Sequence, residues 1–151
     1  MTVGLWTPWL LLAHSSPAAV RLQAMASAAQ NRQFVGQCAE RHAPGLACDF
    51  RQTNHEGVMV DWLQEAFEKD AAVLSNPAGF SVGCVPVLDA LKLIRRPLVE
   101  LHLTNIHQRP KPYSHSLVSQ VAGGVICGFG PAGYLLAVRA VADALVMRAS
   151  A

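Results

Sequence analysis

The stretch AAVLSNPAG, Ala71 to Gly79, shows most directly how this chain is built. Its first five residues are small or apolar and none is charged, which predicts a short strand over Ala71 to Ser75. Asn76 and Pro77 then end the strand and begin a turn, since proline has no backbone N–H to donate. A strand without polar alternation is typical of a parallel sheet covered on both faces. The stretch therefore indicates an α/β fold.

Short apolar strands and helices alternate on both sides of this stretch. The expected strands are Gly4 to Leu12, Leu46 to Arg51, Ala71 to Ser75, Leu98 to Leu103 and Gly124 to Cys127. The expected helices are Ala18 to Arg41, a helix that begins after Gly57, Val85 to Leu93 and Pro131 to Met147. In the second of these, helical spacing predicts an inward face made of Val58, Trp62, Leu63 and Phe67. The alternation predicts a single doubly wound α/β domain over residues 1–151.

Composition narrows the class of protein. The chain has 151 residues, of which 52% are hydrophobic and 15% charged, and its net charge is +2. This length suits one core, and this apolar content excludes a disordered chain. The small net charge argues against nucleic-acid binding, and no apolar run approaches the roughly 20 residues of a membrane-spanning helix. Because soluble domains average about 25% charged residues, we expect self-association to cover much of the surface.

The cysteines give no sign of a metal or redox motif. They are widely spaced, without a C-x-x-C pair, at Cys38, Cys48, Cys84 and Cys127. That spacing does not support a zinc ribbon or a thioredoxin-like motif. Three of the four stand among apolar residues, where buried thiols are common, so we expect free cysteines.

The amino terminus has some character of a targeting segment. Leu10 to Ala13 could form the apolar core of a signal peptide, with small residues after it. No Lys or Arg precedes Arg21, however, so the positive flank of such a peptide is missing. We therefore expect a cytoplasmic chain.

Polar residues directly after the expected strands are the candidates for a site. In a doubly wound sheet, ligands bind beyond the carboxyl ends of the strands, where the strand order reverses. Three segments occupy such places: Asn54 to Gly57, Asn76 to Gly79 and His102 to Ser116. The second has two interpretations, because an Asn-Pro turn that ends a strand explains it structurally. Alternatively, the Asn76 amide orients a water or a ligand oxygen, and Gly79 allows close approach of the backbone.

The third segment begins with His102, two residues after Glu100. His102 is either a structural histidine or a general acid–base, since an imidazole titrates near neutral pH. Further on, Arg109 offers a planar fork to a carboxylate, unless the loop is simply solvated. A metal site made of His102, His107 and His115 would have a spacing that matches no compact ligand pattern, so no metal is expected.

Four motifs occur in a recognisable order from Phe50 to the carboxyl terminus. They are FRQTNHEG (Phe50 to Gly57), NPAG (Asn76 to Gly79), VELHLTNIHQR (Val99 to Arg109) and VAGGVICGFGPAGY (Val121 to Tyr134). Together they resemble the type II 3-dehydroquinate dehydratases. The resemblance implies a flavodoxin-like fold with a five-stranded parallel sheet, in trimers that assemble into a dodecamer. It also implies a lyase of the shikimate and quinate pathways, which dehydrates 3-dehydroquinate, a small carboxylate, to 3-dehydroshikimate without metal, cofactor or Schiff-base lysine.

The resemblance also implies a mechanism. A tyrosinate removes a proton alpha to the ketone, an asparagine-bound water stabilises the enolate, and a histidine protonates the departing hydroxyl. Asn76 matches the asparagine, His102 the general acid, and Glu100 the carboxylate that holds that histidine.

The same resemblance assigns the substrate contacts. Leu103 and Thr104 match the backbone and hydroxyl donors to the substrate carboxylate. Arg109 matches an arginine of the same loop, and Asp89 an acidic residue that reaches the site of a neighbouring subunit.

The chain departs from the family pattern mainly in its first segment. GLWTPWLLLAHSSPAAV, Gly4 to Val20, stands where the family has a strand followed by GPNLNLLG and a loop with an arginine and a tyrosine. The only two tyrosines of the chain are Tyr113 and Tyr134, so the tyrosine base and the arginine that activates it are missing. Tyr113 falls where the family has an arginine that grips the substrate, and Val82 near a family histidine.

These departures leave three hypotheses open. The first is a working dehydratase with a rearranged site, which uses Tyr113 or a water as base. The second is a catalytically silent paralogue that keeps the fold and the carboxylate pocket for ligand binding or regulation. The third is a structural subunit that assembles with an active dehydratase. Because a positioned base contributes about 10²–10⁴-fold to a rate, we expect turnover to be weak or lost.

Overall fold

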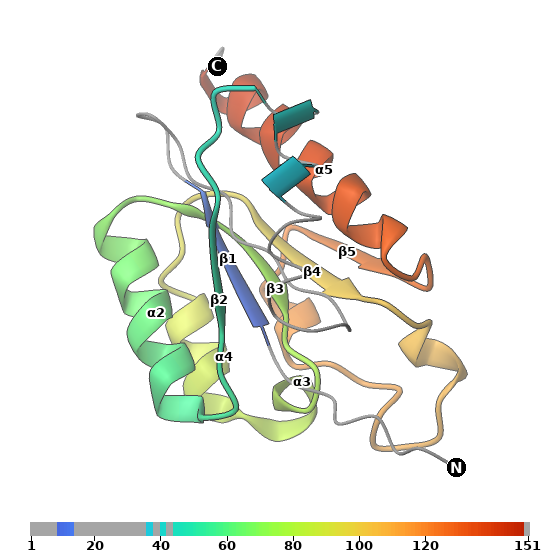
Figure 1. Ribbon diagram of the computed structural model, residues 1–151. Coiled ribbons are helices and arrows are strands. Elements are labelled where there is room, and N and C mark those ends of the chain that lie inside the picture. Colours follow the sequence, from blue (N-terminus) through green and yellow to red (C-terminus); the bar gives the residue numbers. More distant parts are fainter. Residues whose placement is uncertain (1–8, 14–35, 38–39, 42–43, 150–151) are drawn as a thin grey trace.

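The computed structural model describes residues 9–13, 36–37, 40–41 and 44–149. Its strands are β1 (Trp9–Ala13), β2 (Asp49–Gln52), β3 (Ala72–Asn76), β4 (Leu98–His102) and β5 (Gly124–Cys127). Its helices are α2 (Glu56–Glu68), α3 (Phe80–Gly83), α4 (Val85–Leu91) and α5 (Ala132–Ala149), with the short 3-10 helices η1 (Ile106–Gln108) and η2 (Val118–Gln120). Figure 1 shows these elements around a central sheet, and the predicted α/β class is confirmed.

The strands form one sheet in the order β2-β1-β3-β4-β5, which is the strand order of flavodoxin-like sheets. β3, β4 and β5 run parallel, as predicted. β1, however, is antiparallel to both of its neighbours, β2 and β3, so the expectation of a sheet that is parallel throughout is wrong at this strand. The run Leu10 to Leu12 is apolar in either direction, and strands hydrogen-bond in both orientations, so its sequence does not encode its direction.

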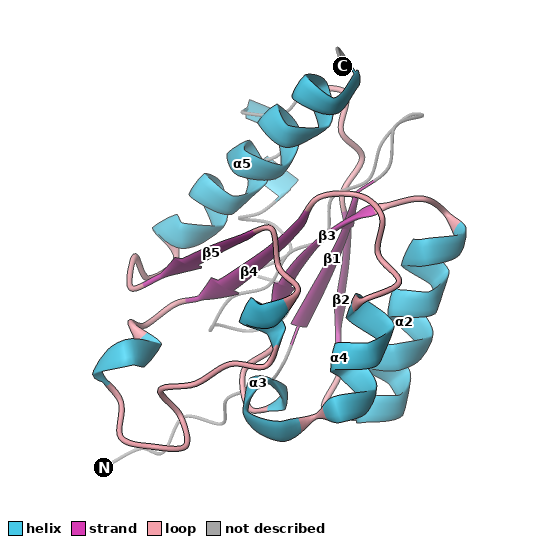
Figure 2. Cartoon of the chain, turned by 180° about the vertical axis from the view of Figure 1, so that it is seen from behind, coloured by secondary structure: helices cyan, strands magenta, loops and turns pink. Residues whose placement is uncertain are grey.

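Helices cover both faces of the sheet. Figures 1 and 2 show α5 on one face and α2 and α4 on the opposite face. Side chains alternate along a strand, so successive residues of β3 enter different cores. Leu74 packs in the core beneath α5, whereas Val73 packs in the core beneath α2 and α4. This alternation also decides which way the polar residues at the strand ends point.

The inward face of α2 differs from the prediction. The buried residues of this helix are Met59, Leu63 and Ala66, whereas Trp62 and Phe67 are half-buried on its flanks. The buried set keeps the i, i+4, i+7 spacing of one helical face, and Val58 of the predicted set is also only half-buried. The ring centroid of Trp62 lies 5.5 Å from the guanidinium carbon of Arg51.

Most other predicted boundaries agree within a few residues. β5 has the predicted bounds, while α4 ends two residues earlier than expected and the short α3 was not predicted. The expected strand Gly4 to Leu12 and helix Ala18 to Arg41 fall largely outside the described residues, although 36–37 and 40–41 are helical. Among the described helices, none is both long and apolar enough to cross a bilayer.

The three described cysteines form no disulfide with one another. Cys84 is buried, and burial raises the pKa of its thiol. Cys48 and Cys127 are half-buried, and Cys38 lies outside the described residues. Among the described residues, the prediction of a free thiol therefore holds for Cys84 and Cys127, and full burial holds only for Cys84.

Candidate active site

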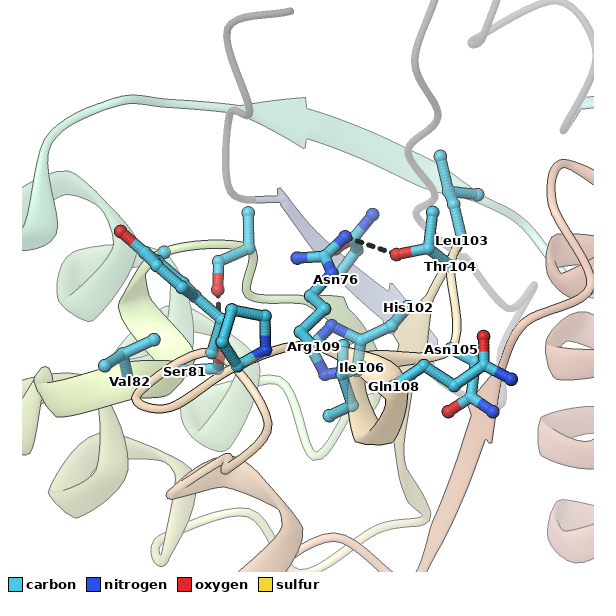
Figure 3. Close-up of a pocket in the computed structure, with 14 residues that line it drawn as sticks. Asn76, Ser81, Val82, His102, Leu103, Thr104, Asn105, Ile106, Gln108 and Arg109 are labelled. Carbon is cyan, nitrogen blue, oxygen red and sulfur yellow. Dashed lines mark hydrogen bonds between the residues drawn. The ribbon is translucent and has the colours of Figure 1, made fainter.

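A pocket of about 680 Å³ opens at the carboxyl ends of β3 and β4. Figure 3 shows the side chains that face it, which come from the end of β3, from α3 and from the loop after β4. Its lining consists of Asn76, Ala78, Gly79, Ser81, Val82, His102, Leu103, Thr104, Asn105, Ile106, Gln108, Arg109, Pro110 and Tyr113. It therefore lies where a doubly wound sheet places its ligands.

Asn76 and His102 meet in this pocket because they are the last residues of adjacent parallel strands. The register pairs Ser75 with Glu100, so both strands end at the same edge of the sheet. His102 and Glu100 share one face of β4, two residues apart, and both side chains are buried. The strand geometry thus places a histidine at the pocket and a carboxylate directly behind it.

The Glu100 carboxylate is fully buried and accepts three hydrogen bonds. His102 Nε2 lies 2.7 Å from Glu100 Oε1, and the hydroxyls of Ser116 and Ser119 donate to the two carboxylate oxygens. Burial alone would raise the pKa of Glu100, but the hydrogen bonds from His102, Ser116 and Ser119 together lower it. An ionised carboxylate only accepts hydrogen bonds, so Nε2 is the donor and Nδ1 is the ring nitrogen left for a ligand.

This buried carboxylate predicts a specific acid sensitivity. Since folding lowers the pKa of Glu100, its stabilising effect is present above the unfolded value of about 4.3 and is lost as the pH falls through the folded value. At pH 7 we expect Glu100→Gln to lower the free energy of unfolding by about 1–3 kcal/mol. Urea midpoints of both proteins between pH 7 and pH 3 should converge at the acid end. A difference that stays constant over this range would contradict the assignment of an ionised Glu100.

Asn76 has a second partner that the sequence did not indicate. Its Nδ2 donates to the hydroxyl of Tyr134 over 3.1 Å, and Tyr134 is a fully buried residue of α5. Burial raises the pKa of Tyr134, and the hydrogen bond from Asn76 offsets only part of that effect. Tyr134 therefore stays a neutral phenol near pH 7, which does not suit it to act as a base.

The loop after β4 brings a cation to the pocket. Arg109 donates from Nη2 to the hydroxyl of Thr104, drawn as a dashed line in Figure 3. Asn105 holds the beginning of η1, where its Oδ1 accepts the backbone N–H of His107 over 3.0 Å. The described lining residues include Arg109 but no Asp or Glu. The pocket is therefore suited to an anionic ligand.

The NPAG turn forms the opposite wall. Ala78 has a left-handed φ of +46°, and its carbonyl accepts the Ser81 hydroxyl over 2.6 Å. Gly79 lines the pocket, and a Cβ built on it would meet no protein atom within 4 Å. The backbone at Gly79 is thus open toward the space that a ligand would occupy.

The structure brings most of the candidate residues together. Seven line the pocket: Asn76, Gly79, His102, Leu103, Thr104, Arg109 and Tyr113. Glu100 stands behind His102, whereas Asp89 lies on α4, exposed and paired with Lys92 over 2.8 Å, outside the pocket lining. Among the described residues, no three His, Cys, Asp or Glu side chains are placed to hold a metal.

Several contributors were not predicted. Ser81, Asn105 and Gln108 line the pocket, and Ser116, Ser119 and Tyr134 support its polar residues from outside. Asn105, Gln108 and Ser116 had a usable signal, since they belong to the polar segment His102 to Ser116 after β4. The contacts of Ser119 and Tyr134 depend on the packing of distant segments.

Comparison with known proteins identifies this arrangement. The family model for class II dehydroquinases matches residues 20–142. The chain belongs to this family. A 3-dehydroquinate dehydratase from Brucella canis is 57% identical over 97 residues, which are 64% of this chain and 62% of that protein. The chain thus covers less than two thirds of the length of this curated relative.

Solved structures of similar proteins resemble the chain as well. The type II dehydroquinase from Propionibacterium acnes superposes with a TM-score of 0.68 at 33% identity, over 73% of this chain and 77% of its own. A 3-dehydroquinate dehydratase-like protein from Bifidobacterium longum superposes with a TM-score of 0.62 at 34% identity, over 79% and 91%. Both likenesses support the α/β fold with a parallel sheet.

Proposed function

We propose that the pocket binds 3-dehydroquinate and dehydrates it to 3-dehydroshikimate, a step of the shikimate and quinate pathways. The observation that carries this proposal is the pairing of His102 with the buried Glu100, in a pocket that Asn76 and Arg109 also line. Family membership and the names of the similar proteins support the same activity.

Each group has a defined task in the proposed reaction. A base breaks the C–H bond alpha to the ketone, and the electron pair forms an enolate on the side of Asn76. The C–O bond then breaks, and His102 gives a proton to the departing hydroxyl, which leaves as water. Glu100 stabilises the imidazolium before that transfer, while Leu103, Thr104 and Arg109 hold the substrate carboxylate.

The group that removes the proton is the least well defined part of the proposed reaction. Tyr134 is buried and neutral, so the phenol that remains for the task is Tyr113, which lines the pocket and is 55% exposed. We propose that Tyr113 or a water removes the proton and that turnover is weak. The lack of a second phenol that could act as the base also favours the alternative, a catalytically silent paralogue that binds a carboxylate or serves as a structural subunit.

Two measurements separate these functions. A dehydratase assay that follows the enone absorbance of the product should show slow but protein-dependent turnover. If no turnover is found, calorimetry with a quinate-like acid distinguishes the ligand-binding paralogue, which releases heat, from the structural subunit, which does not. Absence of both signals at millimolar ligand would overturn the pocket assignment.

Gly79 allows a test of ligand position that leaves the fold intact. Its φ of −66° suits alanine, and a new Cβ would meet no protein atom, so Gly79→Ala should keep the wild-type melting temperature. If the ligand fills that space, the KM or Kd should rise about 10-fold, as expected for an added methyl group in a binding pocket. Gly83→Ala is the matched control, because Gly83 is equally open but lies outside the pocket lining. Equal affinities of the two variants would place the ligand elsewhere.

We further infer a flavodoxin-like, doubly wound fold of five strands, supported by the strand order, with the reversed β1 as its departure. The low charge supports self-association, and we propose that the assembly is a trimer-based dodecamer in the cytoplasm, in which the exposed Asp89 reaches the site of a neighbouring subunit. Light scattering at micromolar concentration tests the assembly, and a monomer would contradict it.

A further inference from the structure

The hydroxyl of Tyr134 lies beneath the pocket rather than in it. Tyr134 is fully buried and is absent from the pocket lining, yet its hydroxyl accepts from Asn76 Nδ2 at 3.1 Å. Asn76 follows Ala72 and Leu74 on the face of β3 that packs with α5, so its amide is directed toward this helix. Tyr134 belongs to that same core, with Leu74 and Leu101.

Gly133 allows α5 to come this close. A Cβ on Gly133 would lie 2.9 Å from Cδ1 of Leu101 and 3.7 Å from Cγ2 of Ile126. Leu101 is fully buried, so a side chain at Gly133 would require its Cδ1 to shift within the core, and glycine avoids that shift. Because Tyr134 is the next residue, the close approach at Gly133 determines how far its ring reaches under β3.

Two backbone hydrogen bonds join the segment between β5 and α5 to the end of β4, which carries His102. Gly130 N–H donates to the carbonyl of Leu103 over 2.8 Å, and Gly128 N–H donates to that of His102 over 3.2 Å. The segment between β5 and α5 is therefore fixed to the end of β4 immediately before it delivers Tyr134. Hydrogen bonds therefore connect α5 and the segment before it to both the end of β4 and Asn76.

We propose that Tyr134 is a positioning residue for Asn76, and that the closely packed start of α5 sets the orientation of the Asn76 amide in the pocket. One amide N–H is used by Tyr134, which fixes the plane of the group and leaves its carbonyl oxygen and second N–H for ligand or water. An amide without that partner rotates about its terminal torsion, which is broad in energy. The expected change in kcat rests on the proposed dehydratase function, whereas the positioning of the Asn76 amide by Tyr134 does not.

Tyr134→Phe tests the proposal because it removes the hydroxyl and keeps the ring in the core. We expect kcat for 3-dehydroquinate to fall about 5- to 10-fold, as for the loss of one hydrogen bond, with KM within about twofold. In an Asn76→Ala background the same change should have no further effect, because the group that Tyr134 positions is gone. An equal loss of kcat in both backgrounds, or none in either, would overturn the proposal.

A spectroscopic measurement keeps this test independent of turnover. In the full chain labelled with ¹⁵N-asparagine, the side-chain amide of Asn76 is identified as the signal missing from Asn76→Ala. Tyr134→Phe should shift that signal and speed its exchange with solvent, while the melting temperature stays close to that of the wild type. An unchanged signal would refute the positioning role, whereas absent turnover with a shifted signal would refute only the proposed dehydratase activity.

Discussion

His102→Ala is expected to lower the kcat for 3-dehydroquinate by about 10²–10⁴-fold, the usual contribution of a positioned general acid. The histidine lines the pocket and is held by a hydrogen bond of 2.7 Å to the buried Glu100. Without it, the hydroxyl group would depart without a proton donor, and Glu100 would lose one of its three partners. Initial rates measured from the enone absorbance provide the readout, with the melting temperature as a check on folding.

His107→Ala is the matched control for this experiment. His107 lies in the same loop, is exposed, and does not line the pocket. It should therefore keep wild-type turnover within about twofold. If His102→Ala retains full activity, or if both histidines matter equally, the general acid has been misassigned and the chemistry lies elsewhere.

The elements that the sequence predicted best are those whose local pattern has a single solution. β5 has the predicted bounds, and Ala71 to Ser75 differs from β3 by one residue at each end, because an apolar run followed by Asn-Pro or Cys-Gly can hardly continue. The direction of β1 was missed, since Leu10 to Leu12 reads the same either way. On α2, the spacing identified Leu63 but not Met59 or Ala66, because spacing alone does not say how deeply each residue of a face is buried.

The residues of the candidate site also differ in how far they could be predicted from local sequence. Asn76 and His102 could be predicted because each ends a strand, and parallel neighbours end at one edge. Tyr134 could not, because its contact with Asn76 spans 58 positions and depends on how closely Gly133 lets α5 pack. The serines that hold Glu100 were missed likewise, since they reach it only after the loop beyond β4 has folded back. The polar residues at the strand ends can be predicted from local sequence, whereas the residues that hydrogen-bond to them are brought there by tertiary packing.

Arg109→Ala should have the second large effect, on binding rather than on the chemical step. Arg109 is a cation of a pocket whose described lining has no Asp or Glu, and its guanidinium is oriented by the Thr104 hydroxyl. A hydrogen bond to a charged group contributes about 1.5–3 kcal/mol, so its loss should raise the KM for 3-dehydroquinate, or the Kd for a quinate-like acid, by about 10- to 100-fold. Calorimetry measures this even if turnover is slow.

Lys111→Ala separates a directed contact from general attraction of an anion. Lys111 carries the same charge two residues further along the loop, but it is exposed and lies outside the pocket lining. Its loss should change the affinity less than twofold at physiological salt, where exposed charges are screened. Arg109→Lys should recover only part of the affinity, because an ammonium group lacks the planar fork. If the three variants weakened binding equally, the anion would be held by the summed charge of the loop, and the substrate carboxylate would have to be placed away from Arg109.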